Sequence, residues 1–140
     1  MQQTANAQHP QSPSLLEASF QANPDLVSLE ARDIIIKAIK GYEDRHIDPR
    51  PVLQTLNVPI KSQRSKKETY SFLRQMQSVI NRRLMLQSKK ITTGSMVELG
   101  SKQYRVTNVA FNGIVELDGH RGGFNPNNLR LVQPAQSTQN

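Results

Sequence analysis

The sequence has no cysteine and no tryptophan, and its four phenylalanines and three tyrosines make up only 5% of 140 residues. Without cysteine there is no disulfide framework, no thiolate chemistry and no zinc–cysteine site. No apolar run approaches the length of a membrane-spanning helix. The N-terminal MQQTANAQHPQSPS lacks the basic and apolar regions of a secretory signal. These absences predict a protein of a reducing compartment, the cytoplasm, without membrane insertion.

Apolar residues are also scarce, at 36% of the chain, which is below the usual share of a compact domain. Part of the chain is therefore predicted to be tail or linker. Residues 1–11 and 133–140 are rich in Gln or Asn and have little to bury, so both are predicted to be disordered tails.

The formal net charge of +7 is concentrated in one stretch. Residues 61–90 contain nine basic residues and one acidic residue, a net charge of +8. Residues 1–60 contain five basic and seven acidic residues, and residues 91–140 contain four and three. A charge that served only solubility would be spread along the chain, so this concentration favours an anionic partner.

Residues 12–90 are predicted to form a helical region of two or three helices. Ser12–Pro13 is a helix start for the short helix SLLEASFQ, and Asn23–Pro24 repeats this signal before DLVSLEARDIIIKAIKGYE. Apolar residues in this second segment share one side, which predicts an amphipathic helix: Val27, Ala31, Ile34, Ile35, Ala38, Ile39 and Tyr42. Between two prolines, VLQTLNV is predicted to form one or two helical turns.

A long basic helix is predicted over about residues 65–88. Ser65 and Glu68 fit a capping box, in which each side chain accepts a hydrogen bond from the other residue's backbone amide. An apolar stripe predicts packing against the preceding helix rather than a dimer seam; it consists of Phe72, Leu73, Met76, Val79, Ile80 and Leu84. The opposite face is polar and basic, with Lys67, Ser71, Arg74, Gln75, Ser78 and Arg82.

Over residues 94–132 the periodicity changes to that of strands. MVEL and QYRV alternate, Asn112–Gly113 fits a two-residue hairpin turn, IVEL follows, and Asp118–Gly119 fits a second turn. GGF is predicted to be a short strand, and LRLV closes the series after NPNN. Five short strands in so short a segment predict a small barrel. The predicted fold class is therefore α+β, with the helical segment followed by a small five-stranded barrel.

Residues 94–132 resemble a small barrel of the Src-homology-three, Tudor and KOW type. The resemblance is carried by a V-x-L strand, a Y-x-V strand, an Asn-Gly hairpin, V-x-L-x-G, and F-x-P-x-x-L at residues 124–129. It implies a helical turn before the last strand, and binding of proline-rich peptides, methylated side chains, RNA or ribosomal surfaces. The first two ligands need several aromatic side chains, whereas this segment has only Tyr104, Phe111 and Phe124.

The candidate binding residues are basic. Four surround the start of the long helix and, with its free amide groups, could hold an anion: Lys61, Arg64, Lys66 and Lys67. Arg74, Arg82 and Arg83 extend the charge along the helix, where short polar neighbours suit contact with a phosphate backbone. A secondary surface on the barrel consists of Arg105, His120, Arg121 and Arg130, for which a merely solvated surface is the competing interpretation.

No pattern of catalytic residues is present, and we expect neither enzyme activity nor a cofactor. The cluster of Glu43, Asp44, His46 and Asp48 has no recurring metal-ligand spacing, which favours a loop over a metal site. A helix-turn-helix leading into Ser65 lacks the usual glycine in its turn. Two hypotheses remain. The chain is either a nucleic-acid-associated protein, RNA slightly ahead of DNA, or an adaptor that docks on an acidic protein surface.

Overall fold

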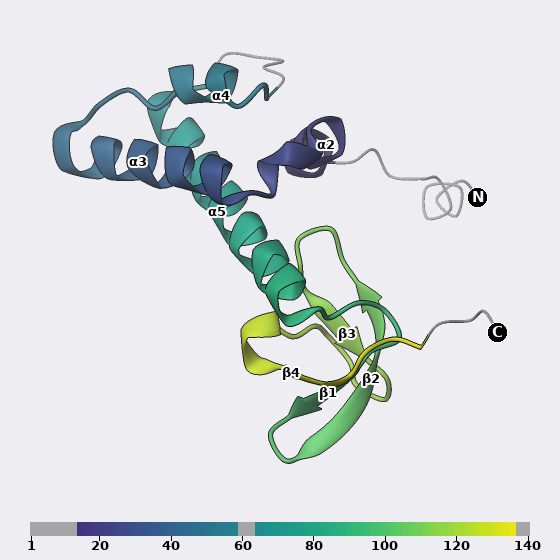
Figure 1. Ribbon diagram of the computed structural model, residues 1–140. Helices are drawn as coiled ribbons and strands as arrows, with labels where there is room; N and C mark the ends of the chain where they lie inside the picture. Colours follow the sequence, from purple (N-terminus) through teal and green to yellow (C-terminus); the bar gives the residue numbers. More distant parts are fainter. Residues whose placement is uncertain (1–13, 59–63, 137–140) are drawn as a thin grey trace, which may run out of the picture.

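The structure, a computed structural model, describes residues 14–58 and 64–136, and it combines helices with an antiparallel sheet. The prediction of two or three helices was too low, because the helical part has four in the described residues. They are α2 (Leu15–Ala22), α3 (Leu29–Arg45), α4 (Pro51–Thr55) and α5 (Lys66–Lys89), and the 3-10 helix η1 (Pro24–Leu26) lies between α2 and α3. In Figure 1, α2, α3 and α4 gather around the N-terminal half of α5, and the sheet lies at its other end. No helix in these described residues is long and apolar enough to cross a membrane.

The helices begin where a side chain satisfies a free amide group. Ser14 caps α2, because its hydroxyl accepts a hydrogen bond from the amide of Glu17 at 3.1 Å. The predicted start at Ser12–Pro13 lies outside the described residues. The predicted start of the second helix at Asn23–Pro24 was wrong: those residues lead only into η1. The backbone leaves the helical conformation at Val27, and α3 starts anew after Ser28, whose hydroxyl accepts from the amide of Ala31.

The long basic helix is confirmed, with a capping box at its start. The Ser65 amide donates to Glu68 Oε1 at 2.9 Å, and the Glu68 amide donates to Ser65 Oγ at 3.0 Å. The helix ends at Lys90, which adopts a left-handed conformation. Its 24 residues give a length of about 36 Å, so one helix extends from the helical part to the sheet.

The predicted apolar stripes of α3 and α5 meet in one core. Ile35 of α3 and Leu73, Met76 and Ile80 of α5 are fully buried there. Phe20 of α2 adds an aromatic ring to the same cluster. This shared core confirms that the α5 stripe packs against α3. Burial of these side chains is a major favourable contribution to the free energy of folding.

The sheet has four strands in the order β3-β2-β1-β4, and all of its pairs are antiparallel. The strands are β1 (Met96–Leu99), β2 (Lys102–Val109), β3 (Val115–Leu117) and β4 (Arg130–Gln133). The alternation is confirmed, since Val97, Val106, Val115, Leu117 and Leu129 are buried in a second core, with Leu99, Tyr104 and Leu131 packed against it. Leu86 and Ile91 extend this core onto the end of α5.

The prediction of a closed five-stranded barrel was wrong. GGF does not form a strand; only Phe124 pairs, in a single bridge with Val115, and Gly122 before it has a positive φ of 77°. Strands β3 and β4 are the two edges of an open sheet in the described residues. The helical turn before the last strand is confirmed as the 3-10 helix η2 (Pro126–Asn128). The predicted tail from residue 133 begins inside β4, because Gln133 pairs with Met96.

Candidate functional site

The solvent-facing side of α5 is polar and basic for most of its length. Seven exposed residues form what we call the α5 polar face: Lys66, Lys67, Ser71, Arg74, Gln75, Ser78 and Asn81. From Lys67 to Asn81 it covers about 21 Å of helix. Glu68 is the acidic residue of α5, and its carboxylate is occupied by the capping box. A continuous face therefore presents cations, hydroxyls and amides.

The cations of α5 have no carboxylate within 4.0 Å in the part of the chain that the structure describes. The ion pairs found there are Lys37–Asp33, Arg50–Asp48 and Arg130–Glu98, all outside α5. Arg74 is held by an aromatic neighbour instead: its Nη1 donates to the Tyr70 hydroxyl at 3.2 Å. That hydroxyl in turn donates to Glu43, so one carboxylate of α3 lies near the Arg74 charge.

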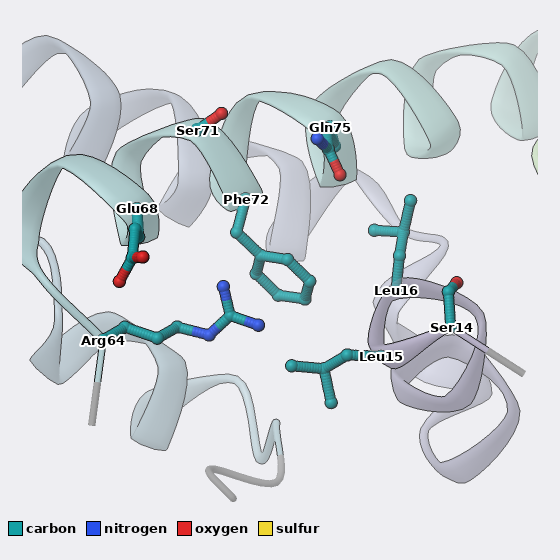
Figure 2. Close-up of a pocket in the computed structure, with 8 residues that line it drawn as sticks. All are labelled: Ser14, Leu15, Leu16, Arg64, Glu68, Ser71, Phe72 and Gln75. Carbon is teal, nitrogen blue, oxygen red and sulfur yellow. The ribbon is translucent and has the colours of Figure 1, made fainter. Parts of the chain in front are cut away.

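Arg64 lies beside the start of α5, at the edge of a pocket between α2 and α5. Its guanidinium is 4.5 Å from the centre of the Phe72 ring, a cation–π contact. The pocket has a volume of about 580 Å³. Figure 2 shows Arg64 and Phe72 facing Leu15 and Leu16 across it. Arg64 is half-buried, and its charge is directed toward this pocket rather than along the α5 polar face.

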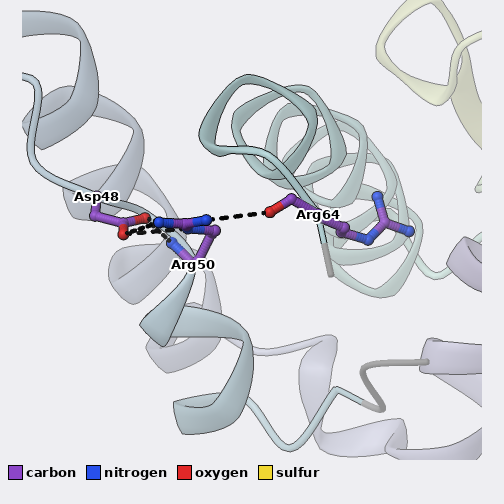
Figure 3. A network of polar contacts seen from close by, with 3 residues as sticks. All are labelled: Asp48, Arg50 and Arg64. Carbon is purple, nitrogen blue, oxygen red and sulfur yellow. Dashed lines mark hydrogen bonds and ion pairs between the residues drawn. The ribbon is translucent and has the colours of Figure 1, made fainter. Parts of the chain in front are cut away.

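The chain before α5 is tied to α4 by a carboxylate and two arginines (Figure 3). Asp48 Oδ2 accepts from Arg50 Nη2 at 2.8 Å, and Arg50 Nη1 donates to the Arg64 carbonyl at 3.5 Å. The Arg50 hydrogen bonds hold the pKa of Asp48 at about 2, below its ordinary value of 3.8. Asp48 and Glu68 thus offset part of the positive charge that the sequence places at this helix start.

Acid should weaken this tie between α4 and α5. A carboxyl whose pKa is lowered by folding stabilises the folded state above its unfolded value and loses that contribution as pH falls. The melting temperature should therefore decline between about pH 4 and pH 2 less steeply in Asp48→Asn than in the parent. Asp118→Asn, an exposed turn residue with the same charge change, is the control. Superimposable profiles for the two variants would show that Asp48 and Arg50 are not paired in solution.

Arg82 does not belong to the exposed face. Its Nε donates to the Asn112 carbonyl at 2.7 Å, and burial lowers the pKa of its guanidinium. It therefore joins α5 to the β2–β3 turn. That turn has three residues rather than the predicted two, since the Ala110 amide donates to the Ile114 carbonyl across it. Arg83 is also half-buried, and Lys61 lies outside the described residues.

The four residues of the predicted secondary surface have different environments in the structure. Arg130 pairs with Glu98 across β4 and β1. Arg105 donates to the Gly94 carbonyl at 3.4 Å, and Arg121 is exposed. His120 stands edge-on to Tyr104, with ring centres 4.5 Å apart, and to Phe124 at 5.5 Å. It therefore covers two half-buried rings of the second core.

Sequence reasoning missed the role of Lys89. Its ammonium donates to the carbonyls of Pro126 at 2.9 Å and Leu129 at 2.6 Å, and thereby fastens η2 to the end of α5. A terminal lysine suits the helix dipole wherever it points, so the sequence contained no signal for this contact. Within residues 14–58 and 64–136 there is no group of three or more His, Cys, Asp or Glu side chains that could hold a metal ion.

Comparison of the chain with protein-family models, with curated proteins and with solved structures finds no match.

Proposed function

We propose that the chain is a non-enzymatic nucleic-acid-binding protein that contacts the phosphate backbone through the α5 polar face. The observation that carries this proposal is the exposed row of Lys67, Ser71, Arg74, Ser78 and Asn81, whose cations form no ion pair within the described residues. Its cations attract phosphate groups, and its hydroxyls and amides donate hydrogen bonds to them. Contacts of this kind give affinity without sequence specificity. RNA is kept slightly ahead of DNA on the resemblance of the strand pattern of residues 94–132 alone, since the sheet is open and does not form the closed barrel of proteins that bind RNA in this way.

Neutralising two cations of this face should weaken binding. In Lys67→Gln with Arg74→Gln, the helix propensity and the buried stripe are retained. The affinity for a mixed-sequence single-stranded RNA should fall on the order of tenfold. The slope of log affinity against log salt concentration should become shallower by about 1.4, since each lost contact with a single strand contributes about 0.7. Fluorescence anisotropy titrations at several salt concentrations measure both quantities.

The matched control removes two charges elsewhere. Lys40 of α3 and Lys102 of β2 are exposed and lie outside α5, so Lys40→Gln with Lys102→Gln lowers the net charge equally. This control should retain most of the affinity. An equal loss in both double variants would mean that only net charge matters, and the α5 polar face would lose its assigned role.

A second candidate function is that of an adaptor docking on an acidic protein. It is favoured by the open edge of the sheet, where β4 pairs with β1 and with no other strand of the described residues, and where Val132 is 38% exposed. Such an edge accepts an added strand. Co-purifying nucleic acid separates the two functions. The ratio of absorbance at the nucleic-acid maximum to absorbance at the protein maximum is measured on the purified protein. A high ratio that falls after nuclease treatment supports nucleic-acid binding, whereas a ratio typical of pure protein from the outset supports the adaptor.

A further inference from the structure

A second polar site lies where α5 meets the sheet part of the chain. A groove of about 240 Å³ separates α5 from the loop around η2. Its lining consists of Ser78, Asn81, Arg82, Met85, Asn125 and Asn127. Five of these six side chains are polar, and none carries a negative charge.

Arg82 lines this groove and is held in place by two contacts with the β2–β3 turn. Its Nε is fixed by the Asn112 carbonyl, and its stem is fixed by the β2–β3 turn: a Cβ added to Gly113 would lie 2.5 Å from the Arg82 Cβ. In the described residues neither terminal nitrogen of the guanidinium has a hydrogen-bond partner. The side chain is half-buried without a carboxylate partner, and burial of an unpaired cation is unfavourable. An anion in the groove would remove this cost.

The neighbouring amide side chains have NH₂ groups that could donate hydrogen bonds to an anion. Asn125 Oδ1 accepts from the Asn127 amide at 2.9 Å, and Asn81 Oδ1 accepts from Arg32 at 3.5 Å. Each of these oxygens accepts one hydrogen bond, and the NH₂ groups of Asn125 and Asn81 make none within the described residues, so they are available to donate. A guanidinium with free terminal nitrogens beside amide donors suits the oxygen atoms of a phosphate group.

We propose that this groove binds one phosphate group of a nucleic-acid backbone. The assignment rests on the proposed function, because Ser78 and Asn81 belong both to the groove and to the α5 polar face. A nucleic-acid strand bound along α5 at Lys67 and Arg74 therefore reaches the groove while it stays in contact with the helix. The sheet part contributes Asn125 and Asn127, so the site needs both parts of the chain.

The test places a carboxylate in the groove without changing its shape. Asn127→Asp is isosteric, and the Asn127 side chain makes no hydrogen bond within the described residues. Asn128→Asp is the matched control: it makes the same charge change at the next position of η2, outside the groove. We expect Asn127→Asp to weaken binding of mixed-sequence single-stranded RNA at least about fivefold more than Asn128→Asp. Equal affinities would overturn the groove assignment. Thermal melting verifies that both variants are folded.

A second measurement separates failure of the groove from failure of the proposed function. If the parent chain binds neither mixed-sequence single-stranded RNA nor duplex DNA, the proposed function is overturned, and titration with inorganic phosphate then tests the groove alone. The ¹⁵N signals of Arg82 Nε and the Asn127 side-chain amide should shift to saturation in the parent. The Arg82 signal should shift likewise in Asn128→Asp and stay unmoved in Asn127→Asp. Unmoved signals in the parent would overturn the groove as a phosphate site. Phosphate shifts together with equal RNA affinities would assign it to free phosphate and overturn the backbone assignment.

Discussion

Replacing Gly113 with alanine is expected to destabilise the chain by roughly 2–5 kcal/mol, as the sum of two effects. Gly113 has a φ of 87°, a left-handed conformation that disfavours any residue with a side chain. The added methyl would also lie 2.5 Å from the Arg82 Cβ and 3.2 Å from the Arg83 amide nitrogen. Since those atoms belong to α5, the β2–β3 turn would have to move away from the helix. Chemical denaturation measures the loss.

Gly119→Ala is the matched control for the Gly113 variant. Gly119 has a similar φ of 83°, but nothing lies within 4 Å of an added Cβ. It should therefore cost only the backbone term, about 1–2 kcal/mol. The difference between the two variants measures the contact between the turn and α5. If the two losses are equal, the turn does not pack on α5 in solution, and the fixed position of Arg82 is lost with it.

Replacing Lys89 with methionine should cost roughly 2–4 kcal/mol. Methionine is unbranched, one atom shorter than lysine and similar in helix propensity, but it cannot donate to the Pro126 and Leu129 carbonyls. Hydrogen bonds from a charged donor are stronger than neutral ones, and partial exposure of Lys89 reduces the total. Amide exchange at η2 should accelerate with the loss of stability, because this ammonium holds η2 against α5.

The neighbouring residue provides the control for Lys89. Lys90→Met makes the same change one position later. The Lys90 side chain is exposed, and its backbone has a φ of 61°. That left-handed conformation is retained in the variant, so the free energy of unfolding should change by less than about 0.5 kcal/mol. Equal effects of the two substitutions would exclude the carbonyl contacts of Lys89 as a source of stability.

Both pairs of variants bear on binding as well as on stability. The groove between α5 and η2 has walls from both parts of the chain. Gly113 packs on α5 at Arg82, and Lys89 of α5 donates to carbonyls around η2, so both residues join the helix to the sheet part. A variant that loosens either contact should lower the affinity for a ligand that contacts both walls of the groove. The α5 polar face, in contrast, is formed by one helix and does not depend on the sheet.

The sequence by itself determined the features that depend on interactions between residues close together in the chain. The capping box needs only Ser65 and Glu68 at a spacing of three, and the apolar stripe of α5 follows from the helical repeat. Alternation likewise determined which strand residues face the second core. The exposed cations Lys67 and Arg74 were predictable because they lie opposite that apolar stripe.

Only the tertiary structure decided what depends on residues distant in sequence. Arg82 and Arg74 have the same chemistry, yet Arg82 turns to a carbonyl 30 positions away and leaves the exposed face. Lys89 contacts carbonyls 37 and 40 positions away, and no periodicity marks them. The strand count also differed, because pairing of GGF requires a partner backbone within hydrogen-bond distance, and only Phe124 has one. Long-range contacts of this kind depend on how the elements pack together, whereas capping and amphipathicity depend on neighbouring residues alone.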